Sequence, residues 1–355
     1  MAQNSFGTLF KLTSFGESHG KYVGGVIEGV TPGLEINGDF IQSELNRRRP
    51  AQSLIATLRD ETDKIEFISG IFEGKATGAP IAFLIPNKNH NSNDYNELKD
   101  VFRPSHADYI YFVKYGIHDY RGGGRSSGRE TAVRVAAGAI AKLMLKKYDI
   151  SVMAYTSQIG NIKIEKPYFE LDINTAESNF VRCPDTSKAE EMIRYLKQIK
   201  NENDSAGGVV TCVIKNVPAG IGEPVFDKLS AMLAHALMSI NGAKGFELGS
   251  GFRAAQMRGS EHNDQFFMNE GRVRTRTNNS GGIQGGISNG EDIYFNVAFK
   301  PVSSINRVQK TVNKFGQEVE IKIGGQHDVC FVPRAVPVVE AMAAITVIDA
   351  ALIRG

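Results

Sequence analysis

The order of strand-like and helix-like segments limits the fold of this chain more than any other feature. Short runs rich in Val, Ile, Phe and Tyr, bounded by Gly, Pro or Asn, predict β-strands at Lys21–Val30, Lys64–Phe72, Pro80–Pro86, Val152–Ile164, Gly208–Val217, Asp292–Phe299 and Gln317–Ile323. Apolar periodicity predicts helices at Asp39–Arg48, Ser127–Lys147, Ser187–Lys200, Glu223–Ile240 and Arg334–Ile353. Because the two kinds do not alternate regularly, a doubly wound Rossmann sheet is disfavoured and an α+β layered fold is expected.

No internal repeat and no low-complexity linker divides the 355 residues, so we expect a single domain over residues 1–355. The most apolar stretch, Ala335 to Ile353, carries Glu340 and Asp349 within it. Two carboxylates inside such a stretch indicate a buried or subunit-interface helix rather than a membrane span. The first residues show no charged-then-apolar signal pattern, and the three cysteines form no CxxC pair. A cytoplasmic protein with buried thiols is expected, with no membrane partner and no metal site.

The bulk charge excludes one class of partner. The formal net charge is only +2, so the chain is not a generic nucleic-acid binder held by positive charge. An RNA binder of the arginine–glycine type is also disfavoured, because the single such element lacks repeated aromatic interleaving. Any preference for anions must therefore come from local clusters of arginine.

The strongest such cluster is the run Tyr120–Arg129, which we call the arginine–glycine run. Ser127 and Glu130 have the spacing of a capping box, and a periodic Ala/Val-rich segment follows them. Glycines before a helix start let an anion approach free backbone N–H groups, and arginines match phosphate oxygens geometrically. The alternative is a flexible glycine turn with solvated arginines. Because three arginines, two serines and a cap coincide, we favour an anion site.

Two histidines lie in tight loops bounded by glycine or proline, His19 in Gly16–Gly20 and His106 in Arg103–Tyr109. Either one alone is more often structural, but together they are candidates for proton transfer near neutral pH. Further candidate segments are Arg47–Pro50, the glycine-dense Asn278–Ser288, Lys300–Ser304 and Gln326–Asp328. The chain has no Walker A motif, no zinc-spaced ligand set and no GxSxG elbow.

These motifs occur together in an order and spacing that resemble the chorismate synthase family. The matching stretches are Phe15–Gly20, Asn46–Pro50, Arg103–Tyr109, Tyr120–Ala132, Ile240–Glu247, Ser280–Ile287, Lys300–Ser304, His327–Asp328 and Arg334–Pro337. Each stretch alone is weakly specific, whereas the combined set is highly specific.

The resemblance implies a lyase of the shikimate pathway for aromatic amino acids. The expected reaction converts 5-enolpyruvylshikimate 3-phosphate into chorismate and inorganic phosphate by a 1,4-anti elimination. The resemblance implies reduced FMN as the cofactor at the site. FAD and NADP are also associated with the family, and NADPH is expected only as a possible external reductant. The implied fold is a β-α-β sandwich with helices packed between antiparallel sheets. The implied assembly is a homotetramer, with a separate flavin reductase as a possible partner.

The resemblance also implies roles for individual residues. The expected catalytic residues are His19 as the acid near the leaving phosphate, His106 beside the reduced flavin, and Asp328 near flavin N5. The expected substrate ligands are Arg48, Arg129 and Arg334. The expected flavin ligands are Arg125, Ser126, Ser127, Asn241, Gly242, Gly286, Lys300, Pro301, Val302, Ser303, Ser304 and Gln326. The alternative is a flavin- or phosphate-binding protein without activity, which would not need the two histidines and Asp328.

The chain departs from the family pattern at three positions. Gln326 and Leu54 stand where arginine is usual, and Ser105 replaces a usual glycine in the second histidine loop. Gln326 removes the charge from one expected flavin or phosphate contact, and Leu54 receives no role.

Overall fold

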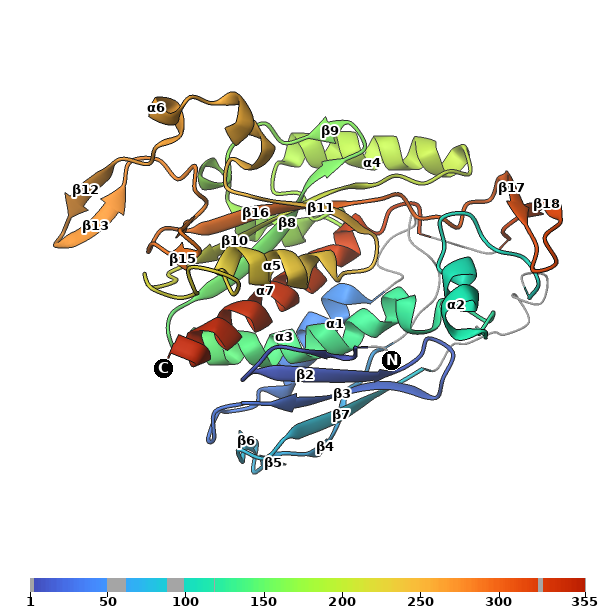
Figure 1. Ribbon diagram of the computed structural model, residues 1–355, viewed down its shortest axis with the longest axis horizontal. Helices are drawn as coiled ribbons and strands as arrows, with labels where there is room; N and C mark the ends of the chain where they lie inside the picture. The colour runs from blue at the N-terminus through green and yellow to red at the C-terminus, as the bar shows by residue number, and fades with distance from the viewer. Residues whose placement is uncertain (1–2, 50–61, 88–98, 118, 325–327, 355) are drawn as a thin grey trace.

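A computed structural model describes residues 3–49, 62–87, 99–117, 119–324 and 328–354 of the chain (Figure 1). The first of its two main sheets has the strand order β1-β2-β3-β7-β4, and every pair in it is antiparallel. Its strands are β1 (Ser5–Phe6), β2 (Lys11–Gly16), β3 (Tyr22–Glu28), β4 (Glu66–Ser69) and β7 (Ile81–Pro86). Alternating burial along β7 shows that one face of this sheet packs on the core.

The second main sheet has the order β11-β16-β10-β8-β9 and is also antiparallel throughout. Its strands are β8 (Ser151–Ile159), β9 (Ile162–Lys163), β10 (Gly208–Lys215), β11 (Ala243–Leu248) and β16 (Ile293–Phe299). The central strand β10 is buried along most of its length, because helices cover the sheet on both of its faces.

Four helices fill the space between the two sheets, as Figure 1 shows. They are α1 (Gly38–Arg48), α3 (Thr131–Lys146), α5 (Leu229–Met238) and α7 (Val332–Arg354). One hydrophobic cluster contains side chains from both sheets and from all four helices. The architecture confirms the expected α+β sandwich, with helices between antiparallel sheets.

Helix α7 is apolar on all sides because it lies in the middle of this sandwich. Its most apolar window is long and apolar enough to cross a membrane, but 83% of that window is buried within the protein. Asp349 is satisfied there, since its carboxylate accepts the backbone N–H groups of Thr8, Leu9 and Phe10 at 2.7–2.9 Å. The expectation of a buried helix is confirmed.

Smaller elements surround the sandwich. Helix α4 (Thr186–Asn201) covers the outer face of the second sheet, α2 (Asp108–Tyr115) follows the second histidine loop, and α6 (Gly259–His262) is one turn long (Figure 1). Short hairpins are formed by β5 (Ile71–Phe72) with β6 (Lys75–Ala76), β12 (Phe266–Asn269) with β13 (Arg272–Thr275), β14 (Ile283–Gln284) with β15 (Ile287–Ser288), and β17 (Val308–Val312) with β18 (Glu318–Lys322).

Two helix predictions need correction at their starts. The helix expected from Ser127 begins as a 3-10 turn at Gly128–Glu130, and the α-helix proper starts at Thr131. The helix expected over Glu223–Ile240 is shorter, because the residues before Leu229 form turns around Gly222 and Gly286.

Candidate active site

Three of the expected substrate arginines lie at helix ends that converge. Arg48 is the last residue of α1, Arg129 lies in the 3-10 turn that leads into α3, and Arg334 is in the first turn of α7. The start of a helix carries a partial positive charge, so the first turns of α3 and α7 add to the field of the guanidinium groups. The fold therefore brings three guanidinium groups and the starts of two helices together, beside the C-terminal end of α1.

A buried aspartate joins two of these arginines. Asp63 Oδ2 accepts hydrogen bonds from Arg48 Nη2 at 2.5 Å and from Nε at 3.2 Å, and Asp63 Oδ1 accepts from Arg129 Nη1. Burial alone would raise the pKa of Asp63, but the charges of Arg48 and Arg129 outweigh it and lower the pKa below its ordinary value. Asp63 therefore stays ionised and fixes the spacing of the two guanidinium groups.

Arg334 joins the same cluster from α7. Its Nη1 donates to Asp328, an expected catalytic residue, and its Nε donates to the backbone oxygen of Arg48 at 3.2 Å. The structure thus brings Arg48, Arg129, Arg334 and Asp328 together. Among the described residues, these three guanidinium groups pair with the carboxylates of Asp63 and Asp328.

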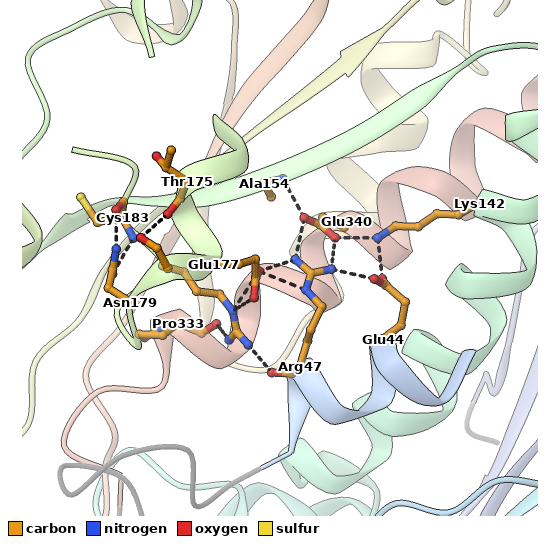
Figure 2. Close-up of polar contacts among 12 residues, drawn as sticks. Glu44, Arg47, Lys142, Ala154, Thr175, Glu177, Asn179, Cys183, Pro333 and Glu340 are labelled. Carbon is orange, nitrogen blue, oxygen red and sulfur yellow. Dashed lines mark hydrogen bonds and ion pairs between the residues drawn. The ribbon is translucent and has the colours of Figure 1, made fainter. Parts of the chain in front are cut away.

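A second network, seen in Figure 2, holds the ends of α1 and α7 in place. Arg182 donates to the backbone oxygens of Arg47 at 2.7 Å and Pro333 at 2.5 Å, the residues directly before Arg48 and Arg334. The buried carboxylate of Glu340 accepts from Arg47 and Lys142, each at 2.6 Å. These contacts tie the backbone of two expected substrate ligands to the core.

His19 lies in the turn between β2 and β3 and is only 7% exposed. Asn87 holds this turn by donating to the backbone oxygens of Glu17 at 2.9 Å and Gly20 at 2.7 Å. The other amide atom of Asn87 accepts from Arg129 Nε at 2.6 Å, which links the histidine turn to the arginine cluster.

The arginine–glycine run packs directly against His19. A methyl group on Gly122 would lie 2.6 Å from Cδ2 of the His19 ring, so this position requires glycine for a close approach. Arg125 donates to Ser14 Oγ at 2.6 Å and to the backbone oxygen of Gly16 at 3.1 Å, on strand β2. Arg121 instead pairs with Asp119 at the surface. The three arginines of the run therefore point to three different places.

The predicted capping box is wrong, because Ser127 Oγ bonds the backbone N–H of Arg129 and not that of Glu130. Ser127 does cap the 3-10 turn, because its Oγ accepts the backbone N–H of Arg129 at 3.3 Å. Glu130 does not reach back to Ser127; its carboxylate accepts from Arg134 Nε at 2.8 Å and from Ser14 Oγ at 3.1 Å. A tertiary contact with β2 has replaced the local bond.

His106 lies just before α2 and its side chain is 21% exposed. Its Nδ1 is 2.6 Å from Asp108 Oδ1, and Asp108 is held in turn by a bidentate pair with Arg103. Arg103 Nη2 also lies 3.4 Å from the backbone oxygen of Gly122, so the second histidine loop meets the arginine–glycine run.

Several of the expected flavin ligands lie near the loop that carries His106. Lys300 Nζ donates to the backbone oxygen of Ser105 at 2.8 Å, and Lys300 N donates to the oxygen of Gly242 at 3.0 Å. Asn241 Nδ2 donates to the backbone oxygen of Ser126 at 2.7 Å. Burial lowers the pKa of Lys300, and the nearby Lys244 adds to this effect. Pro301, Val302, Ser303 and Ser304 continue from Lys300 toward β17.

The structure offers one direct indication that a ligand belongs here. Asn241 Oδ1 is buried and has no hydrogen-bond partner among the described residues. A buried carbonyl oxygen needs a donor, and a flavin supplies both N–H and O–H groups. The donor set of Lys300 and Arg125 also suits the phosphate of FMN. The residues present therefore fit a flavin.

One expected flavin ligand, Gly286, lies apart from Asn241 within this chain. Gly286 contacts the start of α5 through its oxygen, which accepts from Leu229 N at 2.8 Å, whereas Asn241 follows the end of α5. A helix of 10 residues separates the two by about 15 Å. Gln326 and Leu54 lie outside the described residues.

Sequence patterns missed the residues that connect the site. Asp63 and Asn87 have partners far away along the chain, and no local motif marks them. Asp108 could have been found, because it follows His106 by two residues at the start of a helix. Among the described residues, no three His, Cys, Asp or Glu side chains form a group that could hold a metal ion.

The comparisons with known proteins agree on one family. A family model described as chorismate synthase matches residues 10–352 of the chain. The chorismate synthase of Bacteroides thetaiotaomicron is 60% identical over 346 residues, which cover 98% of this chain and 97% of that protein. That of Christiangramia forsetii is 60% identical over 349 residues, with coverage of 98% and 97%. A crystal structure of chorismate synthase is similar at a TM-score of 0.80 and 30% identity, covering 98% of this chain and 93% of that chain.

Proposed function

The chain belongs to the chorismate synthase family, and from this premise we propose how its residues divide the work of the reaction. The protein is a carbon–oxygen lyase that eliminates phosphate from 5-enolpyruvylshikimate 3-phosphate to give chorismate. The family implies a flavin cofactor. The residue roles that follow, and the identity of the flavin as reduced FMN, are proposals.

The observation that carries the proposal is the convergence of three arginines beside a buried histidine. Arg48, Arg129 and Arg334 would bind the anionic groups of the substrate, since guanidinium groups match the oxygens of phosphate and carboxylate groups geometrically. Charge grows on the phosphate as the C–O bond breaks, and guanidinium groups fixed in advance stabilise that charge without reorganising. Asp63 keeps two of them fixed.

His19 is proposed as the acid that protonates the leaving phosphate. It lies in a turn held by Asn87, and Asn87 also accepts a hydrogen bond from Arg129. The position of His19 relative to Arg129, a proposed phosphate ligand, is therefore fixed. A general acid must lie within hydrogen-bond reach of the group that it protonates.

Reduced FMN, when bound, would supply an electron-rich ring to the breaking C–O bond. Arg125, Ser126, Ser127, Asn241, Gly242 and Lys300–Ser304 would hold it. His106 would hold a proton beside the flavin, and Asp328, paired with Arg334, would assist transfer of the substrate hydrogen.

The orphaned oxygen of Asn241 gives a direct test of the flavin site. Asn241→Ala should weaken FMN binding about tenfold, because one hydrogen bond to the ligand is lost. The matched control is Asn306→Ala, whose exposed amide donates to Asn203 at 3.2 Å. Flavin fluorescence can follow the titration without a tryptophan background, since the chain contains no tryptophan. Equal affinity in both variants would remove Asn241 from the site.

We also propose a cytoplasmic homotetramer, one domain per chain, whose FMN is reduced by a separate reductase and not by NADPH bound to this chain. Exposed apolar side chains support contact between copies, such as Ile110 and Val113 on α2 and Phe266 and Met268 on β12. The external source of electrons is proposed from the family resemblance, since bacterial-length chains without large insertions usually resemble members that depend on a separate reductase.

A further inference from the structure

The carboxylate of Asp108 is surrounded by four hydrogen-bond donors. Its Oδ2 accepts from Arg103 Nε at 2.7 Å and from the backbone N of Arg103 at 3.1 Å. Its Oδ1 accepts from Arg103 Nη2 at 2.7 Å and lies 2.6 Å from His106 Nδ1. The side chain is only 5% exposed, so water competes little for these contacts.

The charge state of Asp108 decides which atom of His106 carries the proton. Burial alone would raise the pKa of Asp108, but hydrogen bonds from Arg103 and His106 outweigh it and hold the pKa well below its ordinary value. An ionised carboxylate can only accept hydrogen bonds, so the short contact requires His106 Nδ1 to donate. In the neutral ring, Nε2 is then the atom with a free lone pair.

The surroundings of the loop favour the same geometry. Arg103 and Asp108 face the ring from its own loop and from α2, and Lys300 approaches from the end of β16 by donating to the Ser105 oxygen. Arg103 also reaches the Gly122 oxygen, beside His19. The His106 ring is therefore held directly by Asp108, and contacts of Arg103 and Lys300 anchor the loop that carries it.

We propose that Asp108 is a positioning residue, which holds His106 in the Nδ1–H tautomer and leaves Nε2 as the atom that exchanges a proton with the bound flavin. The inference rests on the proposed role of His106. Arg103 acts with it, because its two parallel bonds fix the carboxylate plane against the histidine ring. The arrangement uses the same logic as a catalytic histidine oriented by a buried aspartate.

The geometry also predicts what Asp108→Asn would do. An amide NH2 group at the Oδ2 position would face two Arg103 donors, and neither of them can become an acceptor. At the Oδ1 position it would face one Arg103 donor and His106, which can move its proton from Nδ1 to Nε2. The second orientation is less unfavourable, so the variant should reverse the tautomer of His106.

The test is nuclear magnetic resonance of protein labelled with 15N in its histidine rings, above neutral pH, with His106→Gln to assign the signals. In the natural chain, Nδ1 of His106 should give a protonated, pyrrole-type signal and Nε2 an unprotonated, pyridine-type signal. Asp108→Asn should exchange the two types. An unchanged tautomer in Asp108→Asn, or an Nε2–H tautomer in the natural chain, would overturn the proposal.

The matched control is Glu291→Gln. Glu291 also accepts from Nε and Nη2 of one arginine, Arg274, each at 2.7 Å, and from a backbone N–H at 2.9 Å, but no described histidine bonds to it. This control should leave both the His106 signals and turnover unchanged. A loss of turnover equal to that of Asp108→Asn would mean that the effect is structural and would contradict the proposal.

Kinetics then connect the tautomer to the reaction. Asp108→Asn should lower kcat by about 100-fold or more, in the range of proton-transfer catalysis, with little change in KM. Asp108→Glu, which keeps a carboxylate acceptor, should recover part of the lost kcat. This variant also replaces Asp108→Asn in the test if the asparagine variant folds poorly.

In a His106→Ala background, Asp108→Asn should lower kcat no further. A further drop in kcat as large as in the natural chain would contradict the proposal. If His106→Ala alone retains turnover, the proposed role of His106 fails, while the tautomer measurement still decides what Asp108 does.

Discussion

At the scale of single residues, Ser105 shows how a departure from the family pattern is accommodated. Its backbone φ is 56°, in the left-handed region where a side chain is unfavourable and glycine is not. The glycine usual at this position therefore has a conformational reason, and the serine here keeps the same backbone. The strained residue lies next to His106, and its oxygen accepts from Lys300.

Ser105→Gly should raise the free energy of unfolding by about 0.5 kcal/mol, because relief of the left-handed strain exceeds the added chain entropy of glycine. The control is Ser43→Gly, at an exposed position inside α1, which should lose about 0.5 kcal/mol through poorer helix propensity. Urea unfolding measures both. A loss of stability in Ser105→Gly, of the same sign as the control, would contradict this reading of the loop.

Sequence motifs pointed to candidate site residues, but they did not predict the contacts that join residues far apart in the sequence. The glycine- and proline-bounded loops drew attention to His19 and His106, and the structure links both to one cluster. Asp63 could not be found in this way, since its partner Arg129 is 66 residues away. From sequence alone, a carboxylate within a polar stretch is expected to be exposed to solvent. Only the folded structure shows that Asp63 is buried between two arginines.

At the scale of elements, α1, α3, α7 and β8 are held together by the buried ion network in Figure 2. Glu340 on α7 accepts from Arg47 on α1, from Lys142 on α3 and from the backbone N–H of Ala154 on β8 at 2.8 Å. Burial alone would raise the pKa of Glu340, but the charges of Arg47 and Lys142 outweigh it and lower the pKa. The network therefore contributes stability only while Glu340 is ionised.

Glu340→Gln should lower the free energy of unfolding at pH 7 by about 1–3 kcal/mol, because Arg47 and Lys142 lose one buried carboxylate while both keep their pair with Glu44. A carboxylate with a lowered folded pKa stabilises above its unfolded pKa, about 4.3, and this stability is lost as the pH falls further. The difference between the natural chain and the variant should therefore shrink below about pH 4.

Denaturant unfolding at pH 7 and at lower pH measures this difference. Glu165→Gln is the control, because its pair with Lys163 is exposed and should contribute less than about 1 kcal/mol. A difference for Glu340→Gln that stays constant with pH would contradict the assigned role.

Elements with a strong periodic pattern were predicted well, and those defined by tertiary contacts were not. Helix α7 and most strands of the two main sheets follow from apolar patterning, whereas β1, β2 and β11 lie outside the predicted strand ranges. Helix α2 was missed because several of its apolar side chains are exposed, so it lacks the pattern of a buried face. The start of α3 was misplaced because Glu130 bonds to Ser14 on β2 instead of capping its own helix.

At the scale of the whole molecule, the sandwich brings arginines from separate helices together in a chain whose formal net charge is only +2. Helix ends from α1, α3 and α7 meet where the loops of the first sheet and of β16 also end. The sequence pattern predicted layers, and the family resemblance predicted the sandwich. Neither could predict that Asp63 and Asn87 would join the arginines to the His19 turn, since this depends on packing.

One measurement tests the central claim, that this arrangement carries out a flavin-dependent elimination, most directly. The purified protein is mixed anaerobically with chemically reduced FMN and 5-enolpyruvylshikimate 3-phosphate, and released phosphate is followed beside oxidised FMN and the His106→Ala variant. We predict phosphate release with chorismate formation only for the natural chain with reduced FMN, while the variant keeps its fold and is nearly inactive. Absence of release from the natural chain, with flavin and substrate both bound, or near-normal turnover in His106→Ala, would contradict the account.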